Sequence, residues 1–166
     1  TVAKNKLLMT VADRFAGQEE AIFELNERDV KAVGKSFEGE KDRMKDAVDR
    51  VRLKTDDLKQ MCEDLRRVAD LPDPVGEVTS MQQRPNGMQV SRVRAPIGVV
   101  GVISEFGPRI MTESVALCLK SGNVCVYRGG PEWLQTTTVQ GPGRPEPVRP
   151  GRGGPTRRPG RRPRAP

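Results

Sequence analysis

Apolar residues recur every three or four positions through residues 4–70, the spacing of amphipathic helices. Gly17 and the polar stretch 34–40 divide this region, and Thr55 is suited to cap the start of a last helix. Pro72 and Pro74 end that helix. We therefore predict helices whose inner faces carry Leu8, Val11, Ala12 and Phe15, then Ile22 and Leu25, then Met44, Val48 and Val51, and finally Leu58, Met61, Leu65 and Val68.

Two extended stretches follow, residues 75–84 and 88–94, on either side of Pro85-Asn86-Gly87. An Asn-Gly pair supplies the positive φ angles that a tight hairpin turn needs. The sequence therefore predicts a β-hairpin here.

The next section has the pattern of a strand–helix–strand unit. Residues 96–103 are uniformly apolar, as in a parallel strand that is covered on both faces. Residues 112–120 have a helical pattern, and Ser121-Gly122-Asn123 favours the end of that helix. A second apolar strand, 124–127, leads into Arg128-Gly129-Gly130. The fold class is therefore α/β, with one right-handed βαβ unit.

The net charge of +7 is concentrated at one end of the chain. Residues 131–166 hold eight Arg, no Lys and two Glu, whereas the first 130 residues hold 21 basic and 20 acidic side chains. From residue 141 onward, 22 of 26 residues are Pro, Arg or Gly. Such a composition does not bury enough apolar surface to fold, so we predict a disordered tail over residues 133–166.

Two origins of the tail are open. An Arg-rich disordered arm can bind nucleic acid, although this one offers no aromatic side chain for stacking except Trp133. Reading a GC-rich gene in a shifted frame also produces Arg, Pro and Gly in excess, and we favour this interpretation.

The residue inventory excludes several kinds of site. The chain has no His, so Cys–His and Ser–His catalysis within it is excluded. Cys62, Cys118 and Cys125 lack metal-binding spacing, so we expect no metal site and no disulfide framework. We interpret all three as reduced thiols packed in the interior, in a cytoplasmic protein. The longest apolar run, 97–103, is too short to span a bilayer.

The candidate binding residues are Arg128, Gly129 and Gly130, at the carboxyl end of a predicted parallel strand. Ligands bind at that edge in open α/β sheets, and Arg pairs well with phosphate. The alternative is a strand-to-helix turn with a surface Arg. Gly98 and Gly101 do not form a dinucleotide fingerprint, because the third glycine and the opening helix are missing at the required offset.

Several segments together resemble one family. Residues 92–103 and 116–123, followed by Arg128-Gly129-Gly130, are similar to characteristic stretches of gamma-glutamyl phosphate reductases. Residues 4–8, 71–78 and 84–87 resemble further family segments in the same order. The resemblance covers about residues 1–132 and marks the chain as an N-terminal fragment with an unrelated tail.

The resemblance implies an aldehyde-dehydrogenase-like fold, with residues 1–132 as the N-terminal part of its cofactor-binding region. It implies NADPH-dependent reduction of L-glutamyl 5-phosphate in proline biosynthesis, by an enzyme that can form homo-oligomers. The implied cofactor contacts are Arg128, Gly129, Gly130, Ser104 and Glu105. The catalytic cysteine is expected well beyond Pro131, so none of the catalytic residues is expected among these 166.

One departure from the family stands out. The family has Arg-Pro-Asn in the loop after the first predicted parallel strand, where this chain has Gly107-Pro108-Arg109.

Two other hypotheses about function remain open beside the enzyme fragment. In the first, the chain is a short protein with a nucleic-acid-binding tail. In the second, it is a degenerate relative that acts as a structural partner of the full-length enzyme.

Overall fold

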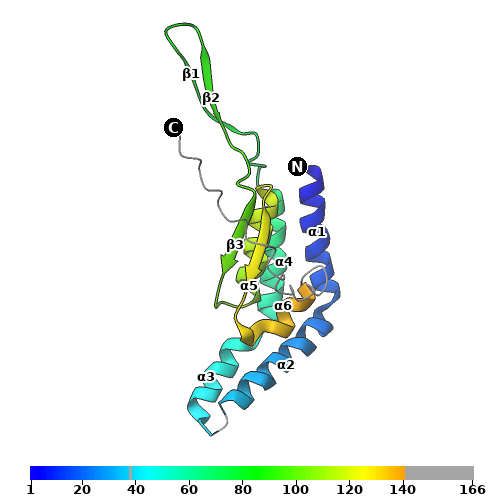
Figure 1. Ribbon diagram of the computed structural model, residues 1–166. Helices are drawn as coiled ribbons and strands as arrows, with labels where there is room; N and C mark the ends of the chain where they lie inside the picture. Colours follow the sequence, from blue (N-terminus) through cyan, green and yellow to red (C-terminus); the bar gives the residue numbers. More distant parts are fainter. Residues whose placement is uncertain (38, 141–166) are drawn as a thin grey trace, which may run out of the picture.

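The computed structural model describes residues 1–37 and 39–140, and shows a helical body, a hairpin that projects from it, and one βαβ unit (Figure 1). The predicted tail from residue 141 onward lies outside the described residues. Residues 1–70 form four helices, as the pattern predicts. Their bounds are α1 Val2–Gly17, α2 Glu19–Ser36, α3 Lys41–Val51 and α4 Thr55–Asp70.

The start of α4 differs slightly from the prediction. Thr55 is the first helical residue rather than the cap. The Asp57 carboxylate accepts the Lys54 backbone N–H at 2.9 Å and so satisfies the turn that opens the helix.

The main core lies where α4 packs between α1 and the βαβ helix α5, Pro108–Lys120. Most of it is built from residues that the helical pattern placed inward, whereas Met44 of α3, also predicted inward, is exposed. Leu8, Ala12 and Met61 are almost completely buried. Residues from α2 and from the α3–α4 connection complete this cluster.

A buried lysine joins the first turn of α1 to the end of α5. Lys120 is 3% exposed, and its ammonium donates to the Ala69 carbonyl and to Asn5 Oδ1, both at 2.7 Å. Lys4 in turn donates to the Lys120 carbonyl at 3.1 Å. These hydrogen bonds compensate for the cost of burying the ammonium.

The predicted hairpin is present as β1, Val78–Gln83, and β2, Gln89–Val93, in antiparallel register. Its turn differs from the prediction, because only Gly87 has a positive φ, of 85°. Pro85 and Asn86 are the central residues of a turn closed by the Gly87 N–H donating to the Arg84 carbonyl at 2.9 Å. Every residue of both strands is exposed, so the hairpin extends away from the body (Figure 1).

The predicted βαβ unit is also present. Strands β3, Val99–Ile103, and β4, Val124–Arg128, pair in parallel with Val99 opposite Val124 and Ile103 opposite Arg128. Helix α5 packs on one face of this sheet and on α4 behind it. The strands end at the α2–α3 end of the molecule, opposite the hairpin (Figure 1).

The predicted boundary of the tail is wrong for residues 133–140. Pro131–Trp133 form a short 3-10 helix, η1, that continues into α6, Leu134–Gln140. Trp133 is 7% exposed and Thr136 is fully buried. The low-complexity composition begins only at residue 141, so the sequence before it is able to fold.

Buried polar groups of α2 hold α6 in place. The Asp29 carboxylate accepts the backbone N–H groups of Gln135 and Thr136, at 3.0 and 2.8 Å, and the Thr136 hydroxyl at 2.7 Å. Asn26 donates to the Val51 carbonyl at 3.0 Å and to the Thr136 hydroxyl at 3.2 Å. These contacts satisfy the first amides of α6 and anchor this helix to the helical body.

No helix in the described part of the chain has the length and hydropathy needed to cross a bilayer.

Candidate functional site

The structure brings the predicted binding residues together at the carboxyl edge of β3 and β4. Ser104 and Glu105 follow β3, and Gly129 and Gly130 follow β4. The Ser104 backbone N–H donates to the Arg128 carbonyl at 3.0 Å, one step beyond the last paired residues of the two strands. The two segments therefore lie side by side, as expected for parallel strands that end at the same edge.

The loop between β3 and α5 has its own hydrogen bonds. The Ser104 hydroxyl accepts the Phe106 backbone N–H at 3.1 Å. The Tyr127 hydroxyl, from β4, donates to the Phe106 carbonyl at 3.3 Å. Side-chain contacts thus connect the loop both to itself and to the neighbouring strand.

Arg128 is exposed and has no ion pair among residues 1–37 and 39–140, so its guanidinium is available to an anion. The N-terminus of α5 lies at the same edge and has no acidic residue in its first turn. Unpaired amides and the helix dipole favour negative charge there.

The space beside the two glycines after Arg128 is occupied by other side chains of the protein. A Cβ at Gly129 would lie 3.2 Å from Tyr127 Cε1, and a Cβ at Gly130 would collide with the Glu132 carboxylate. The absence of side chains therefore lets Tyr127 and Glu132 pack over this turn.

The loop that departs from the family pattern is held by two contacts. The rings of Trp133 lie against Gly107. Arg109, in the first turn of α5, forms an ion pair with Asp64 of α4, with Nε 3.3 Å from Oδ2. Asp64 also pairs with Arg67, and its carboxylate is largely buried. Arg109 thus ties the start of α5 to α4.

The three cysteines have the surroundings of packing residues. Cys62 and Cys118 are buried and Cys125 is half-buried, all as free thiols. Burial raises the pKa of the Cys62 thiol. Burial, followed by the neighbouring Cys118 thiol, raises the pKa of Cys125 to about 11. Both shifts oppose formation of the thiolate that a nucleophile needs.

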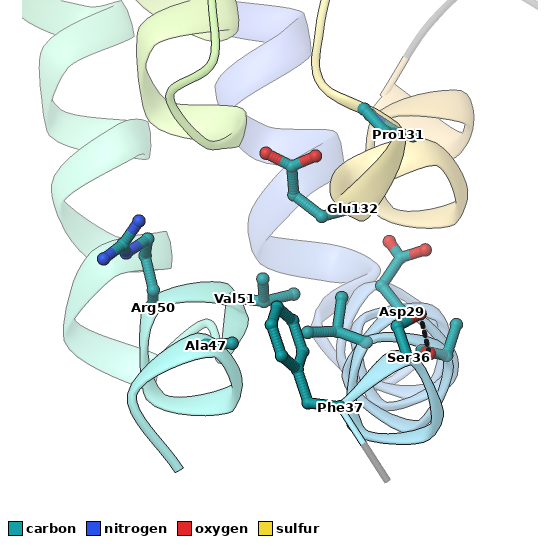
Figure 2. Close-up of a pocket in the computed structure, with 10 residues that line it drawn as sticks. Asp29, Ser36, Phe37, Ala47, Arg50, Val51, Pro131 and Glu132 are labelled. Atoms are coloured by element: carbon teal, nitrogen blue, oxygen red, sulfur yellow. Dashed lines mark hydrogen bonds between the residues drawn. The ribbon is translucent and has the colours of Figure 1, made fainter. Parts of the chain in front are cut away.

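A pocket of about 390 Å³ opens between α2, α3 and η1, directly after the glycine turn (Figure 2). Its wall is largely apolar and includes Phe37, Ala47 and Val51. Figure 2 shows Glu132 and Arg50 on facing sides of the opening, and no ion pair joins them among the described residues. Within the described ranges, no group of His, Cys, Asp and Glu side chains could hold a metal ion.

The fold is that of a segment of an α/β protein of the aldehyde-dehydrogenase-like class. No family model matches the chain. It is 45% identical over 132 residues to a gamma-glutamyl phosphate reductase of Moorella thermoacetica, and 42% identical over 140 residues to one of Meiothermus ruber. Over about four fifths of its own length the chain is similar to gamma-glutamyl phosphate reductases.

Two solved structures show the same similarity. A gamma-glutamyl phosphate reductase of Thermotoga maritima aligns with 82% of the chain at a TM-score of 0.71 and 32% identity. One of Saccharomyces cerevisiae aligns with the same share at a TM-score of 0.72 and 28% identity. The chain spans only about a third of the length of these relatives: 30% and 32% of the two bacterial sequences, and 32% and 34% of the two solved chains.

The extent of the match also corrects the limit of the family-like sequence. The Meiothermus ruber relative aligns with 84% of the chain, which is about 139 of its 166 residues. The match is therefore longer than residues 1–132, in agreement with the folded η1 and α6.

Proposed function

We propose that the family function holds for this protein: NADPH-dependent reduction of L-glutamyl 5-phosphate to L-glutamate 5-semialdehyde in L-proline biosynthesis, with the 166-residue segment inactive on its own. This proposal rests mainly on the amino-acid sequence identity of 40–45% to proteins named gamma-glutamyl phosphate reductase. We also propose a cytoplasmic homo-oligomer, by likeness to the family. We propose no interaction of this protein with a membrane or with a nucleic acid.

In this proposal the segment contributes to the nucleotide site. Arg128 and the amides at the start of α5 supply positive charge at one edge of the sheet, which fits a phosphate-bearing dinucleotide. Ser104, Glu105, Gly129 and Gly130 would line the same crevice. When bound, NADPH supplies the hydride for the reduction.

The nucleophile of the proposed reaction is not assigned to this segment. In the family chemistry a cysteine thiolate displaces phosphate from the acyl phosphate, and the thioester is then reduced to the aldehyde. The raised pKa values of Cys62 and Cys125 and the burial of Cys118 argue against that role for these three thiols.

The reaction is tested in the reverse direction. A protein that contains this segment together with the catalytic cysteine, supplied with glutamate 5-semialdehyde, inorganic phosphate and NADP⁺, should form NADPH, and formation should require phosphate, whereas the 166-residue chain alone should form none. NADPH formation that is independent of phosphate would contradict acyl-phosphate chemistry.

The nucleotide site is tested by binding. Trp133, the only tryptophan, follows the glycine turn, so its emission should be quenched on titration with NADPH. Arg128→Gln should weaken NADPH binding about tenfold, because a hydrogen bond to a charged group contributes about 1.5–3 kcal/mol. Arg84→Gln, at the exposed hairpin turn, is the matched control. Equal affinity of the Arg128 variant and the control would refute this assignment.

A further inference from the structure

Gly107 occupies a backbone conformation that does not require glycine. Its φ of −65° and ψ of −171° are ordinary extended values that any residue adopts. The glycine therefore has to be explained by the space around its α-carbon.

That space is filled by Trp133. A Cβ added at Gly107 would lie 2.8 Å from Cζ2 and 2.9 Å from Cη2 of the indole. Such distances are far inside the van der Waals contact between carbon atoms, so any side chain at position 107 would displace either the indole or the loop.

The indole is not free to move aside. Trp133 is 7% exposed and packs in a cluster with Val30 of α2 and Val51 of α3. The helix that follows it is anchored through Asp29, which accepts the amides of Gln135 and Thr136. Trp133 is therefore a fixed wall that belongs to the helical body, and the loop before α5 rests against it.

We propose that Trp133 is a positioning residue for the β3–α5 loop, and that the Trp133–Gly107 contact sets how closely Ser104 and Glu105 approach the turn after β4. The effect on nucleotide binding rests on the proposed function, whereas the effect on the loop does not.

The pair is tested with the full chain and a double-mutant cycle of Gly107→Ala, Trp133→Leu and the two combined. Hydrogen exchange reports the loop amides of residues 104–107, and calorimetric titration with NADPH, which does not depend on tryptophan emission, reports the crevice. Gly107→Ala should accelerate loop exchange and weaken NADPH binding several-fold. In the Trp133→Leu background the added alanine should have no further effect, because the collision is gone.

Two controls separate positioning from general loss of stability. Gly17→Ala adds a methyl group with nothing within 4 Å, so it should leave loop exchange and affinity unchanged. The amides of α4 should keep their exchange rates in every variant if the effect is local.

Three results would exclude the positioning role of Trp133, and a fourth would separate that role from the nucleotide site. Unchanged loop exchange in Gly107→Ala, or an equal effect of that change with and without Trp133, overturns it. Acceleration that extends equally to α4 also overturns it, since the contact is then only structural. If the wild-type chain binds no NADPH while loop exchange shows the coupling, the positioning role is supported and the proposed nucleotide site fails.

Discussion

Buried or half-buried polar residues in this chain join elements that are far apart in the sequence. Asn26 connects α2 to the chain after α3 and to α6, and Lys120 connects α5 to α1 and α4. Each makes several hydrogen bonds, as buried polar groups require. A single substitution of either residue would therefore remove several hydrogen bonds between helices.

Asp73 should make stability depend on acid pH. Hydrogen bonds from Lys4, then Thr1 and the Val75 amide, lower the pKa of its carboxyl well below the usual range. Because the folded-state pKa lies below the unfolded value of about 3.9, the stabilisation is complete at higher pH and is lost as pH falls below about 4. Asp73→Asn should therefore unfold at lower urea concentration at pH 7, and the difference should shrink towards pH 2.

Exposed pairs provide the control for this titration. Glu24→Gln removes the carboxylate of a surface pair with Arg28, and such pairs contribute little to stability. The urea midpoint of this variant should stay near that of the wild-type chain throughout. A gap between wild type and Asp73→Asn that persists undiminished at pH 2 would exclude the assigned role.

The sequence predicts well which side chains are buried where helical spacing alone determines the buried face of an element. Leu8, Ala12, Met61 and Leu65 are buried because the helical spacing leaves them only one face to share. Asn26 and Asp29 are also buried, yet their polarity gives no hint of it, since each has a partner in α6 more than a hundred residues later. Periodicity within one helix carries no information about such partners.

The candidate site was predictable in outline for a similar reason. Parallel strands fix which ends meet, so Ser104 and Arg128 had to be neighbours once β3 and β4 were recognised. The contact of Trp133 with Gly107 was not predictable, because residues 133–140 were grouped with the Arg-rich tail. The sequence does contain a signal for the true boundary of the folded part, because the share of Pro, Arg and Gly rises abruptly only after residue 140.

At the scale of elements, α6 should be required for stability. A chain that ends after Glu132 loses Trp133 and Thr136 and removes the three hydrogen bonds that Asp29 accepts. Removing a large buried aromatic side chain alone costs about 3–5 kcal/mol. A chain that ends after Gln140 retains all these contacts. The shorter chain should melt several degrees lower than the longer one, as measured by circular dichroism.

The comparison of these two truncations isolates residues 133–140. Equal melting temperatures would show that α6 contributes nothing and would restore the predicted boundary at residue 132. Asp29→Asn in the longer chain should reproduce part of the loss, because the amide oxygen and nitrogen cannot both accept hydrogen bonds.

At the scale of the whole molecule, the outer face of the parallel sheet should drive association. Val99, Ile103, Val124 and Val126 are all at least 59% exposed and lie together on the face that α5 does not cover. Parallel sheets are normally covered on both faces. The 166-residue chain should therefore bind an apolar dye and associate with increasing concentration, as measured by light scattering.

The hairpin is the competing apolar surface, since Val78, Met81 and Val93 are also exposed. Val124→Thr combined with Val126→Thr should reduce association, whereas Met81→Thr combined with Val93→Thr should not. The opposite ranking would assign association to the hairpin, and a sharp monomer in the wild type would show that neither face drives it.

The link between Lys120 and Asn5 has a consequence for synthesis on the ribosome. Asn5 is made 115 residues before the lysine that donates to it. At roughly 5–20 residues per second, α1 emerges on the order of ten seconds before this partner exists. During that interval Leu8, Ala12 and Phe15 lack part of the surface that buries them, so we expect the nascent N-terminal helix to be accessible to chaperones that capture apolar segments.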